Sequence, residues 1–525
     1  MSQPPFVLEQ DALAHYAARD AGRVAVSFPI EKARLTFGEW QLRAQAFARV
    51  LLARGLRPGD HIALLAESRI EWPIVEMAVA MMGGVLVPLN THYRLDDLRY
   101  ALTQSRAKAI VLSPAFRSNA YLEMVDALRE DLPALGLRVL FGEARAGCES
   151  FEQMVSAGMQ MDDMLPGAAP DDVAMLLYTS GTTGFPKGAL ITHRSLMQNA
   201  WVAGNRLGLG EDGVLTTIIP LFHCAGVVGA ILNTLIHGAR YVGIAVFDIE
   251  SMFRIIQEER CTWLTGVPTS FLAMLQHPAR AKYDLSSLRV GTCGGADCNP
   301  DVIEQCARTF PMPGLVQVYG QTEATCFISL CQPGDPQRYA SAGPTVEGTE
   351  ARITHPETRA VLPPGEVGQV ELRGTMIMVG YYDRPKETAE TLDAEGWMQT
   401  GDLGYLTPEG YIVLAGGRLK DMIIRGGENI YPVEVENVMA THEAVAEIAV
   451  FGLPDEYYGE IVAAAVRTRA PVLPEALVAH GGTRIARYKV PVKYFRAETF
   501  PMTSSGKIQK RKLREQVLAG ALAPL

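Results

Sequence analysis

A stretch rich in glycine and threonine at residues 178–188, Tyr-Thr-Ser-Gly-Thr-Thr-Gly-Phe-Pro-Lys-Gly, constrains this chain more than any other segment. The apolar run at residues 173–178 predicts a buried strand that leads into this stretch, and a short second strand is expected after it. Thr192 is predicted to cap the helix that follows. Glycines and hydroxyls between two strands favour a loop that holds a polyphosphate, because converging backbone N–H groups form an anion-binding concavity. The residues predicted to contact phosphate are Thr179, Ser180, Gly181, Thr182, Thr183, Gly184 and Lys187.

This loop differs from two better-known nucleotide signatures. A Walker A loop has Gly-Lys-Ser/Thr in succession, whereas here Pro186 precedes Lys187 and Gly188 follows it. Residues 208–213 match the dinucleotide pattern G-x-G-x-x-G, but they follow a helical pattern instead of a strand, so we interpret them as a turn.

Composition narrows the class of protein. The 525 residues are 48% apolar and 20% charged, which predicts a globular chain of two or more domains. A net charge of −10 disfavours nucleic acid or an anionic membrane as a partner of the whole surface. The eight cysteines form no Cys-x-x-Cys pair, the first residues lack the pattern of a signal peptide, and the most apolar stretch, 77–89, is too short to span a bilayer. A cytoplasmic enzyme with no integral membrane segment is therefore expected.

The pattern along the chain predicts an α/β fold. Helical spacing at 40–54 and 72–82 alternates with strands at 61–65 and 85–88, as in a mostly parallel sheet covered by helices, and this alternation continues to about residue 335. Short β-like runs separated by Gly and Pro turns from 343 to 417 predict a smaller β-rich subdomain or barrel. We predict an N-terminal domain over 1–417, a hinge at 418–421, and a mobile α+β domain over 422–525.

Other candidate site residues lie far from the glycine-rich loop. The segment 319–323, Tyr-Gly-Gln-Thr-Glu, offers an aromatic ring for a base and a hydroxyl for phosphate. Its carboxylate, Glu323, is the hard oxygen ligand that Mg²⁺ prefers when it arrives with phosphates. Asp402, in Thr-Gly-Asp, could accept both hydroxyls of a ribose, and Lys507, beside a glycine near the C-terminus, could swing into a site.

Taken together, these segments resemble the AMP-forming adenylating superfamily, which includes acyl-CoA and aryl-CoA synthetases, adenylation domains of peptide synthetases, and luciferases. The resemblance runs from residue 35 to residue 507, and its segments occur in the order and spacing of the family: 179–188, 220–223, 294–296, 319–323, 400–402, 417–432 and 501–507. It implies a large N-terminal domain, made of two helix-flanked sheets and a β-barrel, followed by a small mobile domain, with the active site between the two.

The resemblance also implies roles for individual residues, carried over by position. Thr182 and Glu323 would hold Mg²⁺, Lys507 would bridge the carboxylate and the α-phosphate, and Lys420 would be the hinge residue. The nucleotide contacts implied outside the glycine-rich loop are Gly294, Gly295, Ala296, Tyr319, Gly320, Gln321, Thr322, Asp402 and Arg418. His223 would gate an acid pocket that also includes Cys224, Ala225, Gly226, Thr325 and Cys326. Gly426 and Gly427 would lie near the thiol tunnel. Asp297 and Cys298 depart from many relatives, so their contacts with adenine are left open.

The predicted function is an AMP-forming acyl-CoA synthetase that uses ATP, Mg²⁺ and coenzyme A. The pocket segments 223–230 and 325–328 are apolar and small, which favours a medium- or long-chain fatty acid, with an aryl or alicyclic acid as the alternative. Transfer of the acyl group to a carrier protein remains open, as does the oligomeric state, for which a homodimer is one option. An α-amino acid is disfavoured, because the position after the gate residue is Cys224 and not Asp. A luciferase-like oxidation and a non-catalytic nucleotide-binding protein are further alternatives.

Overall fold

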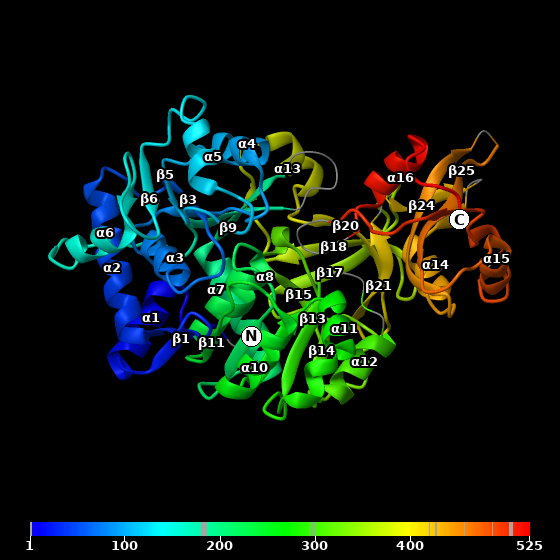
Figure 1. Cartoon of the computed structure of the whole chain (residues 1–525), viewed down its shortest axis with the longest axis horizontal. Helices are drawn as coiled ribbons and strands as arrows, with labels where there is room; N and C mark the ends of the chain where they lie inside the picture. Colours follow the sequence, from blue (N-terminus) through cyan, green and yellow to red (C-terminus); the bar gives the residue numbers. More distant parts are fainter. Residues whose placement is uncertain are drawn as a thin grey trace.

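The structure is a computed structural model of the chain, and it describes residues 3–179, 186–295, 298, 300–418, 421–425, 428–455, 457–485, 487–502 and 508–525. Up to strand β21 (Tyr411–Arg418) the elements form one large body, and the elements beyond it form a lobe at one end of the molecule, coloured orange to red in Figure 1. The predicted α/β fold class, with two helix-flanked sheets, a β-rich part and a C-terminal α+β part, is confirmed.

The first large sheet contains the strands that flank the glycine-rich stretch. Its order is β19-β9-β8-β4-β3-β5-β6-β7, and the pairs from β8 to β7 are parallel whereas β9 is antiparallel to both β8 and β19. The strands are β3 His61–Leu65, β4 Val85–Pro88, β5 Ala109–Leu112, β6 Leu137–Leu140, β7 Glu149–Ser150, β8 Val173–Tyr178, β9 Gly188–Thr192 and β19 Gly380–Tyr381.

The second large sheet carries the Tyr-Gly-Gln-Thr-Glu segment. Its order is β15-β14-β13-β12-β10-β11-β1-β2, parallel except at its two edge pairs, β14/β15 and β1/β2. The strands are β1 Val24–Phe28, β2 Ala33–Thr36, β10 Val214–Thr217, β11 Arg240–Val242, β12 Trp263–Gly266, β13 Val290–Gly294, β14 Gly314–Gly320 and β15 Phe327–Leu330.

Helices cover both sheets and form the layer between them. The central layer packs α1 Glu9–Arg19, α2 Phe37–Ala53, α3 Trp72–Met81, α6 Phe151–Gly158, α7 His193–Leu207, the π-helix η1 Val227–Leu232 and α9 Asn233–Ile236 into the largest core. The first sheet is covered on its other face by α4 Leu95–Ser105 and α5 Tyr121–Ala127. The second is covered by α10 Ile249–Glu259, α11 Pro268–Gln276 and α12 Pro300–Thr309. The 3-10 helix η2 Pro278–Lys282 packs against α10.

Local sequence explains why these elements begin where they do. Successive residues of β3 enter different cores, Ile62 and Leu64 on one face and Ala63 and Leu65 on the other, because a strand buried on both faces needs apolar residues throughout. Thr192 caps α7 as predicted, with its hydroxyl accepting from the backbone N–H of Ser195 at 3.2 Å.

The β-rich segment folds as a five-stranded antiparallel sheet in the order β16-β21-β20-β18-β17. Its strands are β16 Gly343–Pro344, β17 Thr349–Thr354, β18 Gly368–Gly374, β20 Met398–Leu406 and β21 Tyr411–Arg418, and α13 Pro385–Thr391 lies between β19 and β20 in the chain. The C-terminal lobe has β22 Ile423–Arg425, β23 Glu428–Ile430, β24 Val445–Asp455, β25 Gly459–Thr468 and β26 Lys493–Arg496. Its helices are α14 Pro432–Met439, α15 Pro474–Gly482, η5 Arg487–Lys489 and α16 Lys510–Leu518. The domain boundaries at 417 and 421 stay predictions, and residues 419 and 420 lie outside the described residues.

Candidate active site

The ends of the glycine-rich stretch close into a hairpin neck. Tyr178 pairs with Gly188 across β8 and β9, and the backbone N–H of Thr179 donates to the carbonyl of Lys187 at 2.9 Å. A β-carbon at Gly188 would lie 2.4 Å from the Leu176 side chain, which would have to shift to admit a larger residue. Because β8 is parallel to its neighbour β4, the neck opens at the carboxyl ends of the strands, where open α/β sheets bind ligands.

Tyr381 joins this neck to the Tyr-Gly-Gln-Thr-Glu segment. Its strand β19 pairs with β9, which places Tyr381 opposite Ala189. The Lys187 ammonium lies 4.6 Å from the centre of the Tyr381 ring, and the Tyr381 hydroxyl donates to Glu323 Oε1 at 2.8 Å. Two residues predicted from motifs 136 positions apart are thus bridged by one phenol.

The residues predicted for adenine and ribose also come together. Tyr319, near the end of β14, donates its hydroxyl to Asp402 Oδ2 at 2.7 Å. Asp402 is paired in register with Arg418 across β20 and β21, although the Arg418 side chain is outside the described part. Gly294 lies opposite Val318, one residue before Tyr319, and Gly295 has the left-handed φ of +79° that glycine favours.

The segment after Tyr319 folds back on itself. Thr322, Glu323 and Ala324 form the 3-10 helix η3 (Thr322–Ala324), and a γ-turn centred on Thr325 follows, closed by a 2.8 Å hydrogen bond from Cys326 N–H to the Ala324 carbonyl. Thr325 has φ +67° and ψ −57°, a strained conformation for a β-branched residue. Its buried hydroxyl donates to the Met376 carbonyl at 2.7 Å. Such strain persists where the surroundings over-determine it, which is common at functional sites.

The predicted acid pocket begins where the second sheet meets α8 (Cys224–Gly226). His223 Nδ1 lies 3.6 Å from the Cys224 sulfur, and the Thr322 hydroxyl donates to that sulfur at 3.7 Å. A hydrogen bond from Cys326 lowers the pKa of the Cys224 thiol, and the same contact together with burial raises the pKa of Cys326. The structure therefore places Cys224 in contact with His223, Thr322 and Cys326, all of which are predicted site residues.

Glycines in the following helices keep this region narrow. A β-carbon at Gly226 would lie 2.2 Å from the Pro220 carbonyl oxygen, so Gly226 allows α8 to approach the loop before it. The helix continues as the π-helix η1, a form that is rare and often found at functional sites. There a β-carbon at Gly229 would lie 3.2 Å from Phe327. Small residues thus set the separation of η1 and β15.

Several predicted site residues lie outside the described residues and stay predictions. They are Ser180, Gly181, Thr182, Thr183, Gly184, Ala296, Lys420, Gly426, Gly427 and Lys507. Among the residues that are described, the buried Gln321 amide nitrogen has no hydrogen-bond partner, and it is a donor that a bound nucleotide could satisfy. Within the same described part, no group of three or more His, Cys, Asp and Glu side chains is arranged to hold a metal ion.

Sequence reasoning missed Tyr381 and the strap that carries it, residues 376–382. Besides the Tyr381 contacts, the backbone N–H of Met378 donates to the Glu323 carbonyl at 2.8 Å, and that of Tyr382 donates to the Gly188 carbonyl at 2.8 Å. The only local signal is a pair of tyrosines after a glycine, and nothing in it indicates a partner strand 190 residues earlier.

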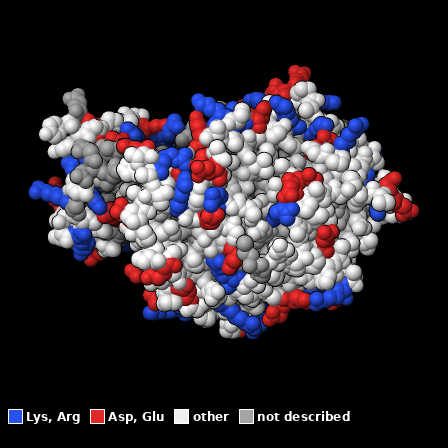
Figure 2. Space-filling view, turned by 180° about the vertical axis from the view of Figure 1, so that it is seen from behind, with Lys and Arg blue, Asp and Glu red and all other residues white. Residues whose placement is uncertain are grey.

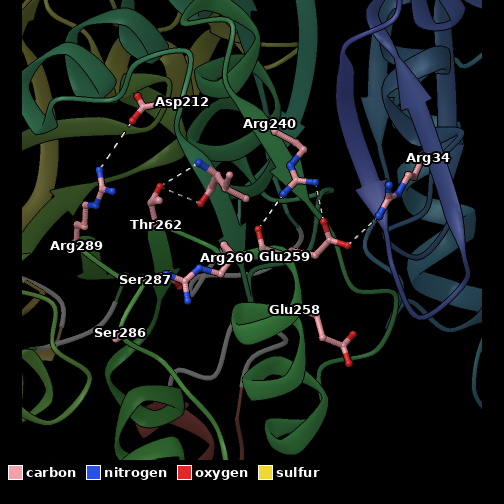
Figure 3. A pocket seen from close by; sticks show the side chains of 11 residues that line it. Arg34, Asp212, Arg240, Glu258, Glu259, Arg260, Thr262, Ser286, Ser287 and Arg289 are labelled. Carbon is pink, nitrogen blue, oxygen red and sulfur yellow. Dashed lines mark hydrogen bonds and ion pairs between the residues drawn. The ribbon is translucent and has the colours of Figure 1, made fainter.

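A surface hollow of about 680 Å³ lies at the opposite, amino-terminal edge of the second sheet (Figure 3). Its arginines each face a carboxylate within 4 Å: Arg34 and Arg240 face Glu259, Arg260 faces Asp284, and Arg289 faces Asp212. The positive charge is already neutralised, so the hollow is a poor site for a polyphosphate. Figure 2 shows the same mixing over a wider area, with Lys and Arg interspersed among Asp and Glu.

A membrane-spanning helix, long and apolar enough to cross a bilayer, does not occur in the described ranges.

Comparison with known proteins agrees with this geometry. The family model described as AMP-binding enzyme matches residues 13–382, and that of the AMP-binding enzyme C-terminal domain matches residues 434–507. A Rhodococcus jostii 3-[(3aS,4S,7aS)-7a-methyl-1,5-dioxo-octahydro-1H-inden-4-yl]propanoyl:CoA ligase is 35% identical over 92% of this chain and 94% of its own. The mitochondrial medium-chain acyl-CoA ligase ACSF2 of Danio rerio is 32% identical over 94% of this chain and 86% of its own. The ATP-bound crystal structure of MatB from Rhodopseudomonas palustris superposes with a TM-score of 0.86 and 29% identity, covering 97% of this chain and 98% of that one.

Proposed function

The chain belongs to the AMP-binding enzyme family and is an AMP-forming acyl-CoA ligase, and from that premise we propose a medium- or long-chain fatty acid as its substrate. The enzyme joins a carboxylic acid to ATP, giving an acyl-adenylate and pyrophosphate, and then transfers the acyl group to the sulfur of coenzyme A. The predicted family and enzyme class are confirmed.

One observation carries the assignment of site residues: Tyr381 brings Lys187 and Glu323 to one place. In the proposal, Lys187 and the 179–184 loop hold the β- and γ-phosphates, and Glu323, with Thr182, holds the magnesium ion. Mg²⁺, once bound with ATP, would neutralise charge on the phosphate oxygens. Glu323 fits this role because it is a hard oxygen ligand beside the phosphate loop, and Mg²⁺ takes few protein ligands when phosphates supply the rest.

The remaining nucleotide contacts follow from the Tyr319–Asp402 pair. Tyr319 would lie against adenine, beside Gly294, Gly295 and Ala296. Asp402 would accept the ribose hydroxyls, with Arg418 beside it in register. The buried Gln321 amide, next to Gly320, would donate to the nucleotide. These contacts fix the sugar and base while the reaction takes place at the α-phosphate.

The C-terminal residues supply the mobile part of the proposal. Lys507 would bridge the carboxylate and the α-phosphate during adenylation, and the turn at Gly426 and Gly427 would lie near the thiol during transfer. A hinge at Lys420 would present the two in turn.

Lys507→Ala should reduce adenylation by at least ~100-fold, equivalent to about 3 kcal/mol of transition-state stabilisation, and should spare thioester formation from preformed acyl-adenylate. Separate assays of pyrophosphate release and of thioester formation measure the two steps. Equal loss in both would contradict this division.

The choice of acid depends on the pocket. The segments 223–230 and 325–328 contain no Asp, Glu, Lys or Arg, so they supply no partner for a second charge on the substrate. The medium-chain specificity in the name of the Danio rerio relative supports a fatty acid. An alicyclic acid remains the alternative, because the Rhodococcus relative is named for a fused-ring propanoate. The eight cysteines are all free thiols, which supports a reducing compartment, and we propose the cytoplasm.

A panel of acids decides among these substrates. Pyrophosphate release from wild-type protein is measured with octanoate, palmitate, benzoate and cyclohexanecarboxylate, each with ATP and Mg²⁺. The fatty-acid proposal expects the highest kcat/KM for octanoate or palmitate, and a preference for a ring acid would overturn it. Acceptor choice is tested by supplying free coenzyme A or a phosphopantetheinylated carrier protein to the adenylate.

A further inference from the structure

The Tyr381 phenol makes two polar contacts that the roles above do not explain. Its ring face lies 4.6 Å from the Lys187 ammonium, and its hydroxyl donates to Glu323 Oε1 at 2.8 Å. Tyr381 is 6% exposed, whereas Lys187 and Glu323 are each half-buried. One rigid aromatic group is therefore shared by the cation and the anion of the site.

The backbone fixes this ring at both ends of its strand. Tyr381 N–H donates to the Thr388 hydroxyl at 2.9 Å, and Tyr381 lies opposite Ala189 in the β19–β9 pair. Met378 N–H donates to the carbonyl of Glu323 itself. The strap thus anchors the Tyr381 phenol to the hairpin neck on one side and to the Glu323 backbone on the other.

A lysine and a glutamate that contact the same phenol carry opposite charges and attract each other. Pairing would neutralise both charges, and each would then have to be separated before phosphate or a cation could bind. The structure shows no ion pair between Lys187 and Glu323, both of which it describes. Tyr381 supplies each with a neutral partner: a π face for the ammonium and a single O–H donor for one carboxylate oxygen.

We propose that Tyr381 is a positioning residue that holds Lys187 and Glu323 apart, each oriented for its own part of magnesium-bound ATP. The inference rests on the proposed function, in which Lys187 binds phosphate and Glu323 binds Mg²⁺. The Tyr381 hydroxyl acts through Glu323 and so changes the binding of Mg²⁺. The Tyr381 ring acts through Lys187 and so changes the binding of the triphosphate.

Two substitutions separate these contributions. Tyr381→Phe removes the hydroxyl and keeps the ring, whereas Tyr381→Leu removes both. Tyr411→Phe is the matched control, because the Tyr411 hydroxyl donates to Asp335 Oδ2 at 2.8 Å outside the proposed site. The full-length proteins are compared by calorimetric titration with ATP, once in EDTA and once with saturating Mg²⁺, and by adenylation assays across a range of Mg²⁺ concentrations.

The expected pattern differs between the variants. Tyr381→Phe should bind ATP normally in EDTA, but the Mg²⁺ concentration for half-maximal adenylation should rise roughly tenfold, as for other partners that orient a metal ligand. The tightening of ATP binding on addition of Mg²⁺ should shrink by a similar factor. Tyr381→Leu should also weaken ATP binding in EDTA by about threefold, because Lys187 loses the ring. Tyr411→Phe should match wild type in every measurement.

Other outcomes overturn the inference. If Tyr381→Phe shifts neither the Mg²⁺ dependence nor the Mg²⁺-induced tightening, or weakens ATP binding equally with and without the metal, the phenol does not position Glu323. A comparable shift in Tyr411→Phe would assign the effect to general loss of a hydrogen bond. If wild-type protein adenylates no acid in the panel, the proposed function fails. If wild type is active and Tyr381→Phe behaves identically, only the present inference fails.

Discussion

The hydrogen bond between Tyr319 and Asp402 allows the ribose side of the site to be tested quantitatively. Its O···O distance is 2.7 Å, and the donor is 5% exposed. Tyr319→Phe removes the donor and keeps the ring that would lie against adenine. Asp402→Ala removes the acceptor together with its proposed contacts to the ribose hydroxyls. A double-mutant cycle of the two substitutions isolates their coupling.

The size of the coupling follows from burial and charge. A hydrogen bond to a charged group contributes about 1.5–3 kcal/mol. Asp402 is half-buried, so screening by solvent lowers the contribution of this bond below that range. We therefore expect a coupling of about 1 kcal/mol, because the carboxylate regains part of the loss by binding water. Since about 1.4 kcal/mol corresponds to tenfold in rate, Tyr319→Phe should lower kcat/KM for ATP about fivefold.

ATP–pyrophosphate exchange with the preferred acid measures this loss directly. In the Asp402→Ala background, Tyr319→Phe should cost less than twofold, because its acceptor is already gone. Full additivity, with Tyr319→Phe costing about fivefold in both backgrounds, would refute the claim that the phenol orients Asp402. Tyr411→Phe, which removes a phenol–carboxylate bond of similar length elsewhere, should leave exchange unchanged.

Two further predictions concern stability of the large body. Thr325→Val removes the hydroxyl that donates to Met376 and keeps the strained turn, so denaturant unfolding should show a loss of about 1–3 kcal/mol, and Thr325→Ser should recover most of it; equal stability of all three proteins would contradict the role of the hydroxyl. Burial raises the pKa of Glu76 well above its usual 4.5, with nearby Glu9 adding to the shift, and neither carboxyl oxygen of Glu76 has a hydrogen-bond partner within the described residues. Because the folded pKa of Glu76 is raised, the contribution of its protonated carboxyl to the free energy of unfolding is complete below about pH 4.5 and is lost as pH rises through the folded pKa. Glu76→Met should therefore unfold at a higher temperature than wild type at pH 8, and the difference should shrink toward pH 4.5. A difference that is constant with pH would exclude titration of Glu76 as its cause.

Features encoded by adjacent residues could be predicted from the sequence. The strand at Val173–Tyr178, the Thr192 cap and the strand at His61–Leu65 have the predicted bounds, because apolar runs and capping residues act over a few positions. Residues 208–213 form the predicted turn: Gly208, with φ +75°, ends α7, and Val214 begins β10. The alternation of elements was likewise sufficient for the α/β class.

Features that depend on distant partners could not be predicted. Tyr381 is important because β19 pairs with β9, and no local pattern specifies a two-residue strand whose partner lies 190 residues earlier. The γ-turn at Thr325 contradicts local preference, which would put glycine at a positive φ. It is stable because the Met376 carbonyl accepts the threonine hydroxyl, which is again a contact between remote segments.

Gly320 shows how the adenine side and the acid side of the site depend on each other. The resemblance to the adenylating superfamily predicts a nucleotide contact for Gly320, the glycine of Tyr-Gly-Gln-Thr-Glu. A β-carbon at this position would lie 1.8 Å from the carbonyl oxygen of Cys326, so a larger residue would displace the chain just after the Thr325 turn. Cys326 contacts Cys224 in the proposed acid pocket, and Tyr319, immediately before Gly320, holds Asp402. Because residue 320 has no side chain, the strand can turn back against its own continuation. One short segment therefore supplies both Tyr319, which bonds to Asp402, and Cys326 in the wall of the proposed acid pocket. A substitution at Gly320 would disturb the binding of both ATP and the acid. Gly295 differs, because its positive φ is a local requirement and there is room for a side chain.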